Sequence, residues 1–171
     1  MLRPSAANPR VAVGGLSLLV VFTVCAGPLP PVNPVVVFAG QSGSAACAGM
    51  ARVVGEKLIG TNASSGVSLT AAPANGSGMF SPSLDSRDGA GPHFVSAFLI
   101  ANSRGGCDAG YDDVRYWPKS CADLAVQELA NLGVLKPLGA VVSTFIMGPN
   151  QHVYLMPAGP GCVTIRKELL F

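Results

Sequence analysis

The chain has 171 residues, a length typical of one domain. Apolar residues make up 49% of it and charged residues 12%, with a formal net charge of +2. Arg3 and Arg10 account for this excess, so the rest of the chain carries equal numbers of basic and acidic residues. Without a basic field, the composition argues against nucleic acid or an anionic membrane surface as a partner.

The N-terminal segment has the composition of a secretory signal peptide. Residues 1–10 are basic, and residues 11–26 are apolar and end in small residues. The apolar run is shorter than the roughly 20 residues that span a bilayer. We expect residues 1–26 to be a signal peptide, with an uncleaved membrane anchor as the alternative. The protein is then exported to a periplasm or the extracellular medium, and meets a membrane only through this segment.

The cysteines agree with export. Cys25 lies in the signal segment, and the four that remain are an even set, which favours two disulfides in an oxidising compartment. Three pairings are possible; we expect Cys107–Cys121 as a local link and Cys47–Cys162 as a long one. No CxxC spacing occurs and both histidines are far away in sequence, so no metal site or cofactor is predicted.

The first half of the mature chain predicts few regular elements. Residues 27–43 are rich in Pro and Gly and are expected to be a tether, followed by an exported α+β domain over residues 44–171. Apolar residues at helical spacing predict a helix over 45–59. Residues 66–71 predict a strand, and the Gly-, Ser- and Pro-rich residues 72–91 predict a long loop.

The second half is more regular. Residues 93–101 are almost entirely apolar, which predicts a central strand buried on both sides. A disulfide-closed loop is expected from Cys107, leading into a helix that Ser120 caps and that ends near Leu132. Three strands joined by short turns follow, over residues 139–147, 152–156 and 162–169. The fold class is thus α+β: one small domain with an antiparallel sheet of about five strands, two helices and two disulfides.

No catalytic residue is assigned. The two histidines, His93 and His152, lie in no recognisable motif, and no Gly-x-Ser-x-Gly sequence occurs. Asp108, Asp112 and Asp113 crowd the expected loop but lack the spacing of a calcium-binding loop, so a solvated turn explains them better than a metal site.

The aromatic residues of the same loop are the candidate binding residues. Tyr111, Arg115, Tyr116 and Trp117 have the composition of a protein-binding hot spot. Trp117 is expected to pack partly in the core, whereas Tyr111 is flanked by Gly110 and aspartates and is expected to be exposed.

A short stretch resembles a known family. The run Cys121-Ala-Asp-Leu-Ala, preceded by a cysteine and a loop with Gly and Pro, is similar to a stretch of the Streptomyces-type subtilisin inhibitors, which are secreted two-disulfide α+β proteins. The similarity covers about residues 107–125. This chain lacks that family's second cysteine pair beside a reactive-site loop, so the resemblance implies no inhibitory loop here.

These features together predict a function class. We expect an exported, non-enzymatic interaction protein that binds another protein or a component of the cell envelope. One alternative is a small secreted hydrolase that uses His152 or the Asp112/Asp113 pair. Others are a protease-inhibitor-like protein and a membrane-anchored subunit of an envelope assembly.

Overall fold

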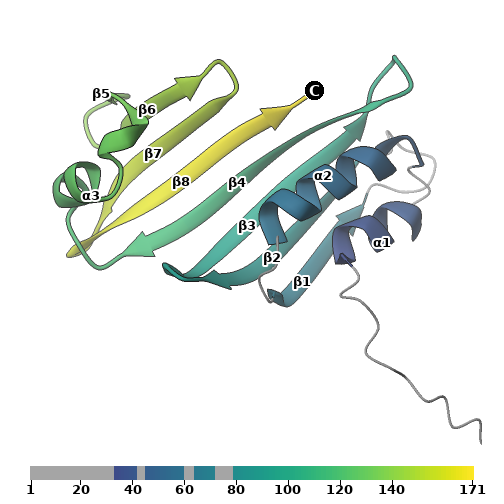
Figure 1. Ribbon diagram of the computed structural model, residues 1–171, viewed down its shortest axis with the longest axis horizontal. Coiled ribbons are helices and arrows are strands. Elements are labelled where there is room, and N and C mark those ends of the chain that lie inside the picture. The colour runs from purple at the N-terminus through teal and green to yellow at the C-terminus, as the bar shows by residue number, and fades with distance from the viewer. Residues whose placement is uncertain (1–32, 42–44, 60–63, 72–78) are drawn as a thin grey trace, which may run out of the picture. The chain divides into compact units, whose positions relative to one another are not determined.

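An antiparallel sheet with helices on one face forms the described part of the molecule (Figure 1). The computed structural model describes residues 33–41, 45–59, 64–71 and 79–171. The sheet order is β1-β2-β3-β4-β8-β7-β6-β5. The strands are β1 (Ser64–Ala71), β2 (Phe80–Asp88), β3 (Gly91–Ala101), β4 (Cys107–Trp117), β5 (Leu135–Pro137), β6 (Ser143–Gly148), β7 (Gln151–Ala158) and β8 (Gly161–Leu170). The helices are α1 (Pro34–Gln41), α2 (Ala48–Ile59) and α3 (Cys121–Gln127), with short 3-10 turns η1 (Ala45–Cys47) and η2 (Ala130–Leu132).

The α+β class and the two disulfides are confirmed, but the predicted size of the sheet is wrong. In the described part of the chain the sheet has eight strands and not about five, although β5 has only three residues, and there are three α-helices and not two. The helix over 45–59, the strand at 66–71 and the C-terminal meander are present as predicted. Ser120 caps α3 as expected, since its Oγ accepts a hydrogen bond from the backbone N–H of Asp123 at 3.1 Å.

Part of the predicted tether is helical. Within residues 27–43, the segment Pro34–Gln41 forms α1. Asn33 caps it by accepting a hydrogen bond from the N–H of Val35, and Pro34 suits a first helical position. Val35 and Ala39 are fully buried, so this segment belongs to the folded unit. The predicted signal peptide, residues 1–26, lies outside the described residues.

Two predicted loops are strands. Residues 80–88, within the expected loop 72–91, form β2, which joins β3 through a tight turn at Gly89 and Ala90. The expected disulfide-closed loop is the 11-residue strand β4, at the centre of the sheet between β3 and β8. Strand β3 alternates buried and exposed residues, so the prediction that it is buried on both sides is also wrong.

The disulfide pairing differs from the predicted one. The bonds are Cys47–Cys107, which ties η1 to the start of β4, and Cys121–Cys162, which ties α3 to β8. Because β4 is extended, its two ends are separated by roughly 30 Å. Bonded cysteines have Cα atoms about 4.4–6.8 Å apart. A Cys107–Cys121 bond across this strand is therefore excluded.

Helices cover the sheet in two places on the same face, which we call the inner face. Helices α1 and α2 pack over the β1–β4 side (Figure 1), and the buried residues there form the first core, which includes Val54, Phe80, Leu84 and Leu99. Helix α3 and η2 contact β6, β7 and β8. The second core there consists of Leu124, Ala125, Phe145, Val153, Leu155 and Cys162.

Described helices do not cover the opposite, outer face of the sheet. Phe94, Phe98 and Tyr116 lie on it with 40–50% of their surface exposed. Phe98 and Leu169 meet over Gly110, where an added Cβ would lie 2.6 Å from the Phe98 ring. The close approach of these side chains explains why a glycine occupies the middle of β4.

Candidate functional site

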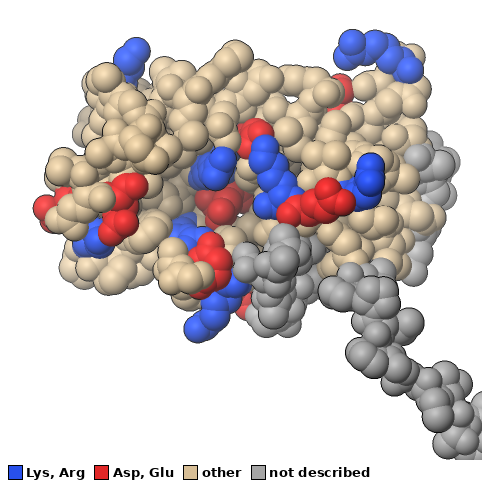
Figure 2. Space-filling model, in the orientation of Figure 1, with Lys and Arg blue, Asp and Glu red and all other residues tan. Residues whose placement is uncertain are grey.

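A cleft lies on the inner face over β4 and β8, between the first and the second core. Two adjoining cavities form it, of about 260 Å³ and about 210 Å³. Asp113 and Arg166 line both cavities. Figure 2 shows charged side chains gathered around a hollow in this face.

Strand register places polar residues on the floor of this cleft. The inner-face positions of β4 and β8 pair as Tyr111 with Glu168, Asp113 with Arg166, and Arg115 with Thr164. Helix α2 contacts β3 and β4 and α3 contacts β7 and β8, so the two helices flank these pairs, and Lys57 of α2 reaches over to Glu168. The polar residues of the central strands are therefore collected between two apolar cores.

Asp88 and Arg115 form the best-defined ion pair at the cleft. The guanidinium of Arg115 donates to both carboxylate oxygens of Asp88, at 2.7 and 2.6 Å. These hydrogen bonds hold the pKa of Asp88 well below its usual range and raise the pKa of Arg115. Asp88 also accepts the N–H of Ala90, so the β2–β3 turn fixes the position of the carboxylate.

Glu168 connects four elements. Its carboxylate accepts hydrogen bonds from Lys57 of α2, from the hydroxyl of Tyr111 at 2.6 Å and from the amide of Gln151 at 3.0 Å. Burial disfavours the charged form, but the bonds from Lys57 and Tyr111 outweigh it and lower the pKa of Glu168. Burial and the bond to Glu168 together raise the pKa of Tyr111. This network links α2, β4, β7 and β8 at one end of the cleft.

His93 and Asp113 form a second pair. The Nδ1 atom of His93 lies 2.7 Å from Oδ1 of Asp113, and the imidazole is almost fully buried. An imidazole oriented by a carboxylate is the arrangement of a general base. Ser86 lies opposite His93 on β2, but it is only 1% exposed and lines neither cavity, so it offers no accessible nucleophile.

The four predicted binding residues do not form one surface. Tyr111 is 4% exposed, contrary to the prediction, because it points inward to Glu168. Arg115 is buried by its pair with Asp88. Trp117 packs partly buried against the second core, as expected, and donates its indole N–H to Thr164 at 3.0 Å. Only Tyr116 is well exposed, on the outer face.

The residues of the predicted hydrolase alternative do not converge. Asp112 and Asp113 are neighbours in an extended strand, so they point to opposite faces. Asp112 pairs with Lys167 on the outer face, whereas Asp113 lines the cleft. His152 is also on the outer face, where its Nδ1 lies 3.4 Å from the hydroxyl of Tyr154.

Several cleft residues were not predicted, namely Lys57, Asp88, His93, Arg166 and Glu168. One signal was present in the sequence. Apolar Phe80, Pro82 and Leu84 alternate with polar Ser81, Ser83 and Asp85, and the structure buries the apolar set. The pair Asp88-Gly89 is typical of a hairpin turn. Pro82 and three serines obscure the pattern. The remaining residues are brought together only by strand pairing and, for Lys57, by the packing of α2 on the sheet.

Comparisons with known proteins add no relative. No family model matches the chain, and searches of curated proteins and of solved structures also found no match. Within the described part of the chain, no three His, Cys, Asp or Glu side chains are placed to hold a metal ion. None of the helices described here is long and apolar enough to cross a membrane.

Proposed function

We propose that this chain is an exported, non-enzymatic binding protein whose ligand lies in the cleft between the two cores. The observation that carries the proposal is the pair of adjoining cavities over β4 and β8, lined by charged groups that the fold holds in place. Concave sites with a few fixed polar groups are the usual binding sites of small ligands. The two disulfides fit the oxidising environment that an exported protein meets.

The cleft favours binding over catalysis. Its charged groups hold one another in pairs, Arg115 with Asp88 and Lys57 with Glu168, which fixes their geometry. The nearest candidate nucleophile, Ser86, is buried outside both cavities. The size of the cavities suits a small molecule or part of an envelope component better than the face of a second protein.

A blocking substitution tests this function. Asn131 lines the larger cavity from η2 and is exposed, so Asn131→Trp should fill the cleft while the fold is kept. Asn150→Trp, in the exposed β6–β7 turn, is the matched control. We expect some members of a library of small acids, alcohols, amines and sugars to shift the backbone amide signals of Asp113, Thr164 and Arg166. Asn131→Trp should abolish these shifts and Asn150→Trp should not.

Two results would contradict the proposal. Ligand-induced shifts confined to the outer face, around Phe94 and Tyr116, would place binding elsewhere. Shifts at the cleft that survive Asn131→Trp would also reject it.

A small hydrolase remains the second candidate, now through His93 and Asp113. The 2.7 Å contact of these two side chains is the observation that favours it. Hydrolysis of an activated ester such as p-nitrophenyl acetate should then be lost in His93→Gln and kept in His152→Gln, with both variants folded. Equal rates in the two variants would remove this candidate.

A further inference from the structure

We infer that the ligand of the cleft is a small amphipathic anion, whose charged group binds Arg166 and whose apolar part lies against the second core. This inference rests on the proposed function, because it names the chemistry of the ligand for the same cleft. It follows from the separation of charge and apolar surface within the larger cavity.

Arg166 is the cation that the cleft leaves available. Lys57 is held by Glu168, and Arg115 is held by both oxygens of Asp88. In the described part of the chain, the guanidinium of Arg166 makes no hydrogen bond or ion pair, although its backbone pairs with β4 and β7. It lies opposite Asp113 in the strand register, and that carboxylate is engaged by His93. A guanidinium carries several donors in a planar fork, which suits carboxylate and phosphate groups.

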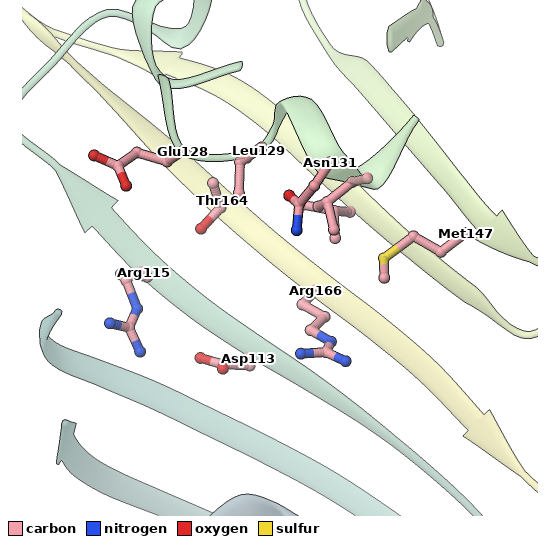
Figure 3. A pocket seen from close by; sticks show the side chains of 10 residues that line it. Asp113, Arg115, Glu128, Leu129, Asn131, Met147, Thr164 and Arg166 are labelled. Atoms are coloured by element: carbon pink, nitrogen blue, oxygen red, sulfur yellow. The ribbon is translucent and has the colours of Figure 1, made fainter. Parts of the chain in front are cut away.

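Four apolar side chains line the larger cavity, together with the polar Glu128, Asn131 and Thr164. Leu129 and Leu132 line it from the η2 region, Met147 from β6 and Val153 from β7. In Figure 3 the guanidinium groups of Arg115 and Arg166 lie on either side of the Asp113 carboxylate, while Glu128, Leu129, Asn131 and Met147 lie across the cavity from them. A ligand that extends from Arg166 towards Met147 therefore meets charge at one end and apolar surface at the other.

Other ligand classes fit less well. A cation could reach the Asp113 carboxylate only between the guanidinium groups of Arg115 and Arg166, which repel it, and this carboxylate is already engaged by His93. A sugar would lack a stacking partner, because no aromatic side chain is among the residues that line the larger cavity. The volume of about 260 Å³ is slightly below the usual range for drug-sized ligands, so the anion is small or only partly enclosed.

The test uses four probes with the same alkyl chain: octanoate, octyl phosphate, octanol and octylamine. Binding is measured by isothermal titration calorimetry and by amide shifts of the cleft residues. At least one anion should bind about tenfold more tightly than octanol, because a charge-assisted hydrogen bond is worth more than a neutral one. A preference for octanoate or for octyl phosphate shows whether the ligand of the cleft carries a carboxylate or a phosphate group.

Variants on β8 then identify the anchor. Arg166→Gln should weaken the preferred anion about tenfold or more and leave octanol unchanged, whereas Arg166→Lys should recover part of the affinity. Lys167→Gln is the matched control, since its side chain lies on the outer face with Asp112. Thermal unfolding of each variant shows that the fold is kept.

The failure of this inference can be separated from failure of the proposed function. Equal binding of octanol and both anions, or no effect of Arg166→Gln, would overturn the anionic ligand and leave the cleft as a binding site. The same holds if octylamine binds best, or if none of the four probes binds while another library member binds in an Asn131→Trp-sensitive way. If no member of the library binds in the cleft, both the anionic ligand and the proposed function are rejected.

Discussion

The two cores of this protein are built on one plan at different scales. In each, a helical segment lies on the inner face and a disulfide ties it to a strand. Among the described residues, the first core has two helices and 14 buried residues, whereas the second has one short helix and six. The smaller core gives less packing to α3, and a seven-residue helix is marginal without tertiary contacts. The second core therefore depends more on its disulfide, Cys121–Cys162, than the first core depends on Cys47–Cys107.

The cleft is a consequence of the same difference. Each core ends before the centre of the sheet, and Asp113 and Arg166 lie in the gap between them. They are the least buried members of the three polar pairs on β4 and β8.

The largest expected effect is the loss of either disulfide. The bonds close loops of 60 and 41 residues, and loops of this length each contribute about 4 kcal/mol in the chain-entropy model. We expect Cys47→Ala/Cys107→Ala and Cys121→Ala/Cys162→Ala to lower the free energy of urea unfolding by amounts of this order. Only the second variant should also open locally, with rapid hydrogen exchange at Leu124 and Glu128. Equal protection of α3 and of β2–β3 in that variant would show that packing alone holds α3.

A matched pair of leucines tests the cores themselves. Leu84 in the first core and Leu155 in the second are both 1% exposed. Leu84→Ala should lower the free energy of unfolding by about 3–5 kcal/mol and Leu155→Ala by about 2–3 kcal/mol, because the smaller core can relax around the cavity. Chemical denaturation measures both. A larger loss at Leu155 would contradict the view that the second core is the weaker one.

The Asp88–Arg115 pair predicts how stability depends on pH. Asp88 and Glu168 have pKa values below those of the unfolded chain, so the folded state binds fewer protons than the unfolded state in mildly acidic solution. Their contribution is complete above about pH 5 and is lost as the pH falls below about 4, towards the lowered folded values. Asp88→Asn leaves Arg115 without its partner and should cost about 1–3 kcal/mol at neutral pH. It should also make the acid decline shallower in urea titrations, and an unchanged slope would contradict this.

The smallest expected effect concerns the two lysine–glutamate pairs. Lys119–Glu128 is largely exposed and lies near the second core, whereas Lys57 reaches a mostly buried Glu168 beside the first. Lys119→Ala should lower stability by less than about 1 kcal/mol, and added salt should erase the effect. Lys57→Ala should cost more and resist salt. Thermal unfolding at low and high salt measures both, and equal costs would show that the Glu168 network is not cooperative.

The sequence predicted those parts of the fold that depend on residues close together in the chain. The helix over 45–59, the cap at Ser120 and the C-terminal meander depend on residues close in sequence. Strand β4 was missed because its Gly and Asp residues disfavour isolated strands. Most of its polar side chains find their partners on other strands, such as Asp88 on β2, His93 on β3 and Lys167 on β8.

The candidate site was hardly predictable for the same reason. Asp112 and Asp113 are adjacent in sequence, yet the pleat of β4 separates them onto opposite faces. Tyr111 was expected to be exposed because its neighbours are polar, whereas its own position faces Glu168. The disulfide pairing also depended on whether residues 107–117 form a loop or a strand.

The order of the disulfides along the chain has a consequence for biogenesis. The four cysteines that the structure describes are bonded in the order in which they occur along the chain, first with second and third with fourth. When a chain crosses a membrane with its N-terminus leading, Cys107 can find Cys47 before Cys121 has emerged. Of the three possible pairings, this order of emergence selects the native one. If the protein is exported as proposed, oxidation in this order would give the native pairing with a thiol oxidant alone, without a reshuffling step by an isomerase.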